Sequence, residues 1–185
     1  MTDTLIATPD AVLRFWLEEL ERKHWFVSTP QLDEEIRTRF GRTHLALAHD
    51  VGSAWRATPE SRLASLIVLD QFPRNMYRAT PLAFATDGLA RREAKLALSV
   101  KADLAVDAAS RCFFYMPFEH SEDLEDQTLS VRLFTELADP EFLDYAIRHR
   151  EVIEKFGRFP HRNAILGRVS TAAEEVYLAQ PGSGF

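Results

Sequence analysis

Apolar side chains recur every three or four residues along much of this chain, the spacing that gathers them on one face of an α-helix. After Pro9 they are Val12, Leu13, Trp16, Leu17 and Leu20. After Pro30 they are Leu32, Ile36 and Phe40. Charged residues fill most of the positions between them, so the pattern predicts two amphipathic helices in the first part of the chain.

Five of the nine prolines follow Thr or Asp, a pair that is typical of a helix start. An oxygen of Thr or Asp accepts hydrogen bonds from free backbone N–H groups in the first turn. Proline at the first helical position loses no intrahelical bond, and its φ already suits the helix. The sequence therefore predicts helix starts at Thr8-Pro9, Thr29-Pro30, Thr58-Pro59, Thr80-Pro81 and Asp139-Pro140.

The run at 63–69 is apolar almost all round, which predicts a helix buried on most sides. Its β-branched pair, Ile67 and Val68, also fits a strand, but the preceding cap and the length favour a helix. Further helices are predicted at 87–99, 107–116, 121–137 and 140–157, with a short final one capped by Ser170. No Asn-Gly or Asp-Gly turn between alternating apolar positions indicates a β-hairpin. We expect an all-α fold with about eight helices.

The first four helix starts are spaced like two successive helical hairpins, the motif from which helical solenoids are built. The second half of the chain does not keep this spacing, and the Trp-Leu-Gly-Tyr pattern of tetratricopeptide repeats is absent. Because no linker or low-complexity segment divides the chain, we expect a single domain over residues 1–185. The ending 180–185 is expected to be a loose tail, with docking of Phe185 onto the body as the alternative.

Composition narrows the class of protein. With 185 residues, of which 46% are hydrophobic, the chain is large enough for a full core. Its single cysteine, Cys112, excludes internal disulfides and is expected to be buried.

Without an export signal or a membrane-length apolar run, we expect a cytoplasmic protein with no membrane partner. The net charge of −6 disfavours nucleic-acid binding but allows a local basic pocket. No dinucleotide or phosphate-loop motif is present, so no cofactor is predicted.

Three other prolines, Pro73, Pro117 and Pro160, lie in segments that combine aromatic and polar residues. The residue before a proline is disfavoured in the α region, so these segments are expected to end or kink helices. The first and third segments share the motif Phe-Pro-Arg-Asn, with a histidine inserted after the proline in the third. We expect Phe72 and Phe159 to plug into the core and the polar residues to project, namely Arg74, Asn75, His161, Arg162 and Asn163. The alternative is that these polar residues only cap exposed helix carbonyls.

The second of these segments runs into a stretch in which five of the eight residues from Glu119 to Asp126 are carboxylates. At a helix N-terminus such residues are stabilised by the macrodipole and need have no other role. A second interpretation is that Arg74, Arg158 and Arg162 bind the carboxylates of this acidic segment through paired hydrogen bonds. The third interpretation is a metal site that combines Glu119 or His120 with His149 or His161. The usual His-Glu-x-x-His and Glu-x-x-His spacings are missing, so no metal is predicted.

The motifs together resemble a bacterial family known as domain of unknown function 924. They are Phe15-Trp16 with Lys23-His24-Trp25-Phe26, Leu69-Asp-Gln-Phe-Pro-Arg-Asn75 with Tyr77-Arg78, Pro117-Phe-Glu-His-Ser-Glu-Asp123, and Lys155-Phe-Gly-Arg-Phe-Pro-His-Arg-Asn163 with Leu166-Gly167. The resemblance extends over nearly the whole chain. It implies an all-helical fold of the tetratricopeptide-like type, with helical hairpins in a right-handed superhelix, and it implies no reaction.

We expect the three proline segments to converge and to line a polar pocket for a small anionic molecule or a peptide end. The candidate binding residues are Asp70, Gln71, Arg74, Asn75, Arg78, Glu119, His120, Glu122, Asp123, Arg158, His161, Arg162 and Asn163. No catalytic residue is assigned, and a homo-oligomer is left open.

Two other functions fit the same residues. In a hydrolase, His120 or His161 acts as general base beside Glu119 on an ester or amide, while Arg74 or Arg162 stabilises negative charge. In a purely structural or oligomer-forming module the polar residues only join helix ends, and exposed aromatic side chains would favour that interpretation.

Overall fold

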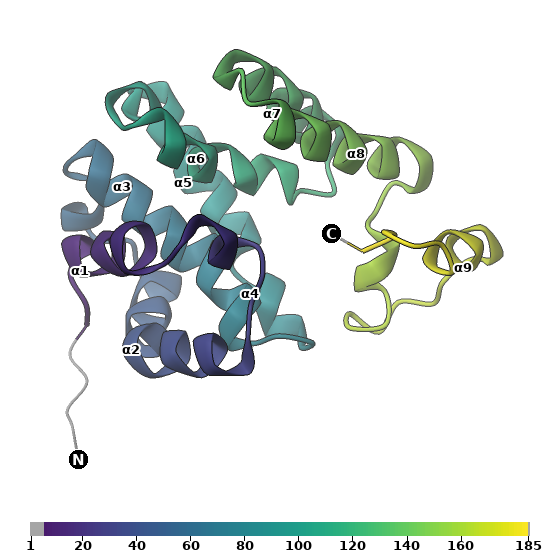
Figure 1. Cartoon of the computed structure of the whole chain (residues 1–185), viewed down its shortest axis with the longest axis horizontal. Helices are drawn as coiled ribbons and strands as arrows, with labels where there is room; N and C mark the ends of the chain where they lie inside the picture. Colours follow the sequence, from purple (N-terminus) through teal and green to yellow (C-terminus); the bar gives the residue numbers. More distant parts are fainter. Residues whose placement is uncertain (1–5, 185) are drawn as a thin grey trace. The chain divides into compact units, whose positions relative to one another are not determined.

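The computed structural model describes residues 6–184, and within that range it contains helices and turns but no strand (Figure 1). The described chain divides into two compact units. The N-terminal unit comprises the residues up to Arg78 together with Leu82–Pro117. The C-terminal unit comprises Ala79–Pro81 and the residues from Phe118 on. Among the described helices, none has both the length and the apolar character needed to cross a membrane.

Eight continuous helices carry most of the described residues, as predicted. They are α1 (Pro9–Leu13) with its π-helical continuation Arg14–Glu19, α2 (Pro30–His49), α3 (Pro59–Leu66) joined through the π-helical Ile67–Gln71 to α4 (Phe72–Met76), α5 (Asp87–Ser99), α6 (Ala108–Glu119), α7 (Leu124–Leu137), α8 (Pro140–Phe156) and α9 (Ala172–Leu178). Short 3₁₀ helices lie between them at Arg22–Trp25, Ser53–Arg56, Pro81–Phe84, Ala102–Ala105 and Pro160–Arg162.

Most of the predicted helix caps are present. Side-chain oxygens accept hydrogen bonds from first-turn N–H groups at Thr8, Thr29, Thr58 and Asp139. Gly157, with φ of +68°, ends α8 in the left-handed conformation that favours glycine. The start predicted at Pro81 produces only a four-residue 3₁₀ helix, and the longer helix begins at Asp87.

One predicted helix start and one predicted cap are displaced along the chain. α7 begins at Leu124 rather than at 121, because the carboxylate of Asp123 caps it by accepting two backbone N–H groups, from Glu125 and Asp126. α9 is capped by Thr171 rather than Ser170. The Thr171 side chain accepts from the N–H of Glu174, whose carboxylate accepts from the N–H of Thr171, and this reciprocal pair fixes the first turn.

The helix end predicted at Phe72-Pro73 is wrong, because the helix continues through Pro73 to Met76, while the alternative of a kink there stays a prediction. Proline has no N–H to offer the carbonyl four residues before it, that of Leu69. A wider π-helical turn precedes the proline, and the hydroxyl of Thr86 donates to the Leu69 carbonyl at 2.6 Å. A hydrogen bond from outside the helix thus replaces the one that proline removes.

The other two proline segments differ from each other. Pro117 lies inside α6, which ends two residues later at Glu119, so the predicted end falls close to the proline. Phe159 has an extended backbone with φ of −87° and ψ of 107°, and only the three-residue 3₁₀ helix Pro160–Arg162 follows it. The predicted break is therefore confirmed at this third segment.

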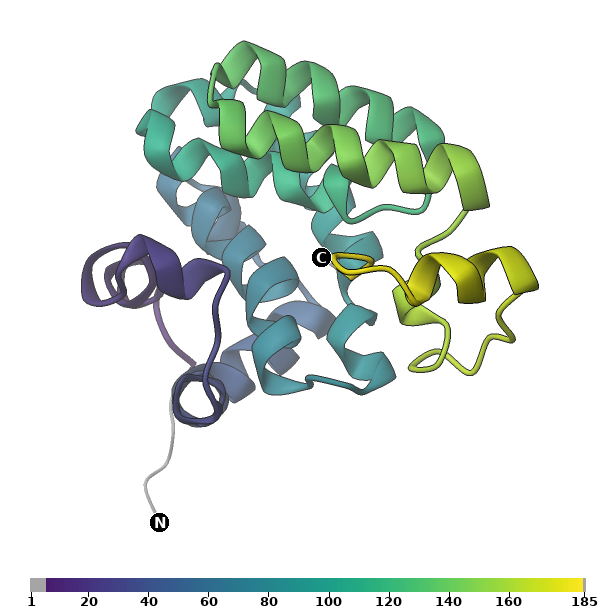
Figure 2. The same cartoon turned by 45° about the vertical axis from the view of Figure 1, so that its right-hand side comes forward.

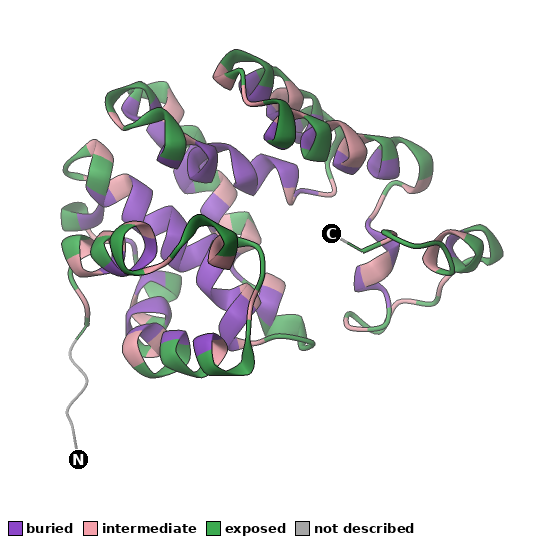
Figure 3. Cartoon of the chain, in the orientation of Figure 1, coloured by how far each residue is buried: buried purple, intermediate pink, exposed green. Residues whose placement is uncertain are grey.

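The core of the N-terminal unit is aromatic and surrounds the helix that runs from α3 to α4. Phe72 is fully buried, with its ring 4.8 Å from that of Phe40 and 5.5 Å from that of Trp16. The predicted plug is confirmed. Figure 3 shows this helix buried along most of its length, which agrees with the prediction from its apolar run. Cys112 is buried, as expected.

In the C-terminal unit α7 and α8 form a hairpin and lie side by side in both views (Figures 1 and 2). The rings of Phe134 on α7 and Phe142 on α8 stack at 5.7 Å. Phe159 is fully buried against Val152 and Ile153 of α8. Because the side chain of Phe159 is buried there, the polar residues that follow it lie at the end of α8.

The residues after α9 form a turn rather than the expected loose tail. The N–H of Ser183 donates to the carbonyl of Gln180 at 3.3 Å, and its hydroxyl donates to the carbonyl of Leu178 at 3.1 Å. The alternative of a docked Phe185 lies outside the described residues.

The bond from Thr86 to the proline-containing helix can be tested by the nearly isosteric change Thr86→Val. It should lower the free energy of unfolding by about 1–3 kcal/mol, because the carbonyl of fully buried Leu69 loses its donor. Thr135→Val is the matched control, since its exposed hydroxyl bonds a carbonyl of its own helix. Chemical denaturation measures both, and equal losses in the two variants would contradict this role of Thr86.

Candidate functional site

The candidate residues of the first proline segment lie in the N-terminal unit and are held by carboxylates. The guanidinium of Arg74 donates two hydrogen bonds to Asp87, at 3.0 and 3.1 Å, and lies 3.3 Å from a carboxylate oxygen of Asp70. Gln71 donates to the other oxygen of Asp70 at 2.6 Å. These pairs join the π-helical turn to α5 through side chains that are mostly buried.

Asn75 and Arg78 both bind Asp33 of α2, the amide at 2.8 Å and the guanidinium at 2.8 and 3.1 Å. Burial alone would raise the pKa of Asp33, but hydrogen bonds from Arg78, Asn75 and Ser28 outweigh it and hold the pKa below its usual value. The candidate residues of this segment thus join α4 to its neighbours. The predicted pairing of Arg74 with the acidic segment stays a prediction, as does the convergence of all three segments.

The second and third proline segments come together in the C-terminal unit around the backbone of Phe159. The N–H of Phe159 donates to a carboxylate oxygen of Glu122 at 2.8 Å. Arg168 donates two hydrogen bonds to the same carboxylate, at 2.7 and 2.9 Å, and a third to the carbonyl of Phe159 at 3.0 Å. We call this arrangement the Phe159 clamp, since Glu122 and Arg168 together hold both backbone polar groups of Phe159.

The clamp keeps Glu122 ionised. Partial burial would raise the pKa of its carboxyl group, but the hydrogen bonds from Arg168 and from the Phe159 N–H outweigh burial and hold the pKa below its ordinary value. Arg168 also donates to the side-chain oxygen of Asn163 at 2.9 Å, and the amide of Asn163 donates to Ser170 at 3.1 Å. The turn that carries His161 and Arg162 is therefore fixed on both sides.

Sequence reasoning missed Arg168 and assigned another partner to Arg158. Arg158 binds Glu174 of α9, at 2.6 and 2.8 Å, instead of a carboxylate of the acidic segment. Arg168, rather than Arg158, pairs with Glu122 of the acidic segment. The available signal was its position directly after Leu166-Gly167, because Gly167, with φ of +66°, forms a turn that sets the direction of the chain at Arg168.

Other residues of the acidic segment serve the local backbone. Asp123 caps α7, which agrees with the interpretation that carboxylates are placed at a helix N-terminus. The amide of Gln127 donates to the carbonyls of Glu119 and Ser121, at 2.6 and 2.7 Å, at the end of α6. These bonds fix the chain on both sides of His120.

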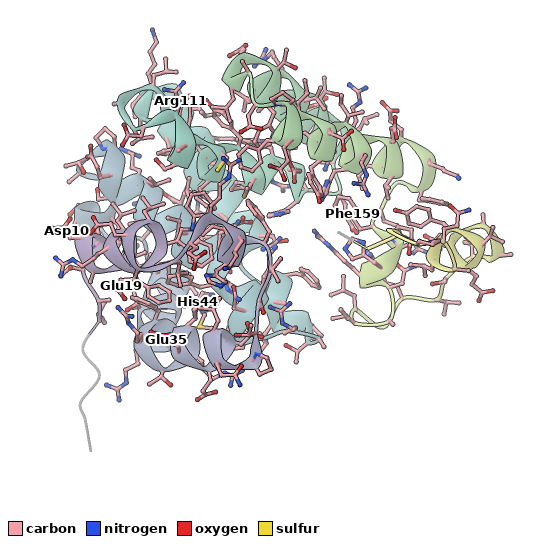
Figure 4. The ribbon with its side chains drawn as sticks, in the orientation of Figure 1. Asp10, Glu19, Glu35, His44, Arg111 and Phe159 are labelled. Carbon is pink, nitrogen blue, oxygen red and sulfur yellow. The ribbon has the colours of Figure 1, made fainter. Side chains whose placement is uncertain are left out.

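Two histidines, His149 and His161, lie against the ring of Phe159, which Figure 4 labels in the segment between α8 and α9, and a third, His120, lies next to His149. Ring centroids are 6.4 Å apart between His120 and His149, 5.5 Å between His149 and Phe159, and 5.6 Å between Phe159 and His161. The guanidinium carbon of Arg162 lies 4.5 Å from the centre of the Phe159 ring. We call these five residues the histidine cluster. His149, Phe159 and Arg162 are buried, whereas His120 and His161 are partly exposed.

Two of the histidines are neutral at pH 7. Burial, aided by the nearby positive charge of Arg162, lowers the pKa of His161 to about 4. Burial also lowers the pKa of His149 well below its usual value, although a hydrogen bond to the Tyr145 carbonyl opposes this. The Nδ1 atom of His149 lies 2.8 Å from that carbonyl oxygen, which only accepts, so Nδ1 carries the proton. A carboxylate oxygen of Glu119 is 3.6 Å from the same nitrogen.

This arrangement suits binding better than proton transfer. A general base works best when its pKa lies near the working pH, and a histidine with a pKa of about 4 is a weak base at neutral pH. Among the described residues, no group of three or more His, Cys, Asp or Glu side chains is placed to hold a metal ion. The cluster instead combines a guanidinium with the neutral imidazole of His161, which carries one N–H donor.

The Phe159 clamp can be tested by Glu122→Gln. The amide keeps an acceptor for the Phe159 N–H but removes the negative charge opposite Arg168, so we expect the free energy of unfolding to fall by about 1–3 kcal/mol. Glu125→Gln, at an exposed carboxylate three residues further on, in the first turn of α7, should change it by less than about 0.5 kcal/mol. Denaturant titration at pH 7 measures both, and indistinguishable stabilities would contradict the clamp.

The lowered histidine pKa values make stability depend on pH. Unfolding returns His44, His149 and His161 to a pKa near 6.5, so the unfolded chain takes up protons first as the pH falls. Stability should be greatest above pH 6.5 and decline between pH 6.5 and 4. His161→Gln should flatten this decline by up to about 1.4 kcal/mol per pH unit. Exposed His49→Gln is the control, and equal slopes in the two variants would contradict the assignment to His161.

Comparisons with known proteins give a family and a related structure. The sequence profile described as "Bacterial protein of unknown function (DUF924)" matches residues 12–182. The solved structure of a protein of unknown function, ATU0120 from Agrobacterium tumefaciens, is similar, with 39% sequence identity and a TM-score of 0.88. The match covers 92% of this chain and 96% of that one. A search of curated proteins found no match. Since the profile spans nearly the whole chain, this protein belongs to the DUF924 family.

Proposed function

We propose that the histidine cluster binds a small anionic ligand through its carboxylate or phosphate group. The observation that carries the proposal is the buried guanidinium of Arg162, stacked 4.5 Å from the Phe159 ring and next in sequence to a partly exposed imidazole. A planar guanidinium forms paired hydrogen bonds to oxyanions, and its stacking on an aromatic ring holds its orientation.

The charges around the cluster support an anion as the ligand. Burial is the largest cause of the lowered pKa of His149 and His161, and the positive charge of Arg162 adds to it at both rings, whereas Glu122 opposes it at His161. The carboxylate of Glu122 is paired with Arg168, which offsets part of its charge. An incoming anion would meet His120 and His161 first, because these rings are partly exposed.

We also propose the finer features that the sequence and the family resemblance suggest. These are a tetratricopeptide-like stacking of the helical hairpins, one domain, a cytoplasmic location, and no nucleic-acid or membrane partner. The hydrolase alternative has less support than binding, because the low pKa of His161 suits a hydrogen-bond donor better than a general base.

Anion binding can be tested by titrating the protein with sodium sulfate and with citrate while following the imidazole resonances by NMR. We expect saturable shifts of His120, His149 and His161. Arg162→Gln should weaken binding about tenfold or more, since it removes the charge and both donors of the fork. Arg132→Gln, at an exposed arginine of α7, is the matched control and should bind like the unchanged protein.

Because Arg162 is buried, its substitution is paired with a check of folding. His161→Gln, which leaves Arg162 in place, should also weaken binding if the imidazole contacts the ligand. Failure of the unchanged protein to bind either anion would contradict the proposal. So would folded Arg162→Gln and His161→Gln variants that bind as well as the Arg132→Gln control.

A further inference from the structure

Gln127 of α7 is fully buried, and hydrogen bonds hold its side-chain amide in one orientation. Its nitrogen, Nε2, lies 2.6 Å from the carbonyl oxygen of Glu119 and 2.7 Å from that of Ser121. Carbonyl oxygens only accept hydrogen bonds, so the group that faces them is the NH₂ of the amide. Its two hydrogens serve these two carbonyls, and the amide oxygen, Oε1, faces away from them. Among the described residues, nothing donates to this buried oxygen.

Ser130, one helical turn further along α7, is also fully buried, and its hydroxyl makes no hydrogen bond within the described part of the chain. Two other hydroxyls of α7 differ from it. Those of Thr128 and Thr135 donate to the carbonyl four residues before them, at 2.8 and 2.7 Å, as hydroxyls inside helices commonly do. The hydroxyl of Ser130 therefore has both its donor and its acceptor capacity unused.

These two unused polar groups lie on one face of the helix. Residues three positions apart on a helix have Cβ atoms roughly 5–6 Å apart. One water molecule with two hydrogen bonds of about 2.8 Å each spans a similar distance. A buried polar group that makes no hydrogen bond destabilises the folded state, and native proteins contain few such groups.

We infer that one water molecule binds between Oε1 of Gln127 and the hydroxyl of Ser130, in the interior of the C-terminal unit. The water donates to the amide oxygen, which only accepts, and it either donates to the hydroxyl or accepts from it. Both side chains are fully buried, so neither presents an exposed atom to a larger ligand. Buried waters in proteins bind polar groups of this kind, which have no other partner.

The water completes the hydrogen bonds of the residue that holds the turn around His120. The amide of Gln127 bonds the carbonyls on both sides of His120, at the end of α6. With its oxygen bonded as well, the amide is fixed at both ends and cannot turn without breaking bonds on both sides. The site therefore links the interior face of α7 to the turn that carries His120, whether or not the histidine cluster binds an anion.

A crystal structure that resolves ordered water tests the site directly. We expect one water peak within about 2.7–3.2 Å of both Gln127 Oε1 and Ser130 Oγ. Ser130→Ala removes the hydroxyl and keeps a good helix former, and the peak should be lost. Thr128→Ala is the matched control, because it removes an exposed hydroxyl of the same helix that bonds a carbonyl of that helix. The peak should remain in this control.

Nuclear Overhauser effects (NOEs) from water test the same site in solution. A water held inside the protein gives the side-chain amide protons of Gln127 an NOE with the sign of a long-lived contact. The amide of exposed Gln31 in α2 is the control, because the water around it exchanges quickly and gives no such signal. The NOE at Gln127 should disappear in Ser130→Ala.

The two measurements can each overturn the inference. A crystal without this water peak, or with a peak that contacts only one of the two atoms, contradicts it. So does a peak that is unchanged in Ser130→Ala, or an NOE at Gln127 that matches the one at Gln31. If Ser130→Ala does not fold, the peak and the NOE of the unchanged protein decide the question. Neither measurement uses sulfate or citrate, so failure here is distinct from failure of the proposed function.

Discussion

The arrangement of the candidate site depends on the clamp that holds the backbone of Phe159. Glu122 accepts its N–H, and Arg168 donates both to its carbonyl and to Glu122. One residue from the acidic segment and one from beyond Gly167 thereby fix a turn that no regular helix supports. The ring of Phe159 is then buried, and His149, His161 and Arg162 are arranged around it.

The cluster that results places a positive charge beside imidazoles that burial keeps neutral. The neutral imidazole of His161 can donate a hydrogen bond to an oxyanion without first gaining a proton, whereas the N–H of His149 is taken by the Tyr145 carbonyl. The guanidinium of Arg162 supplies the positive charge. In the N-terminal unit, Arg74 and Arg78 are each bound to carboxylates of that unit. Similar sequence phrases thus serve helix packing in one unit and a candidate binding site in the other.

Much of the fold could be predicted from the sequence, since helix starts are set by local chemistry that residues such as Thr29 and Asp139 reveal. The helix end predicted at Pro73 was wrong because a distant hydroxyl, that of Thr86, replaces the missing hydrogen bond. Both histidines on the proline segments were identified, yet Arg168 was not, since it lies 46 residues from Glu122 and only the fold brings the pair together. Local patterns report helices and caps, whereas long-range pairs need the structure.

The most direct measurement of the central claim is the location of a bound anion in a crystal soaked in selenate, whose selenium atom gives an anomalous signal. The account predicts an anomalous peak within hydrogen-bonding distance of the Arg162 guanidinium and the His161 imidazole, together with an intact bond from the Phe159 N–H to Glu122. Selenate found solely on exposed arginines, with no density beside Arg162, would contradict it.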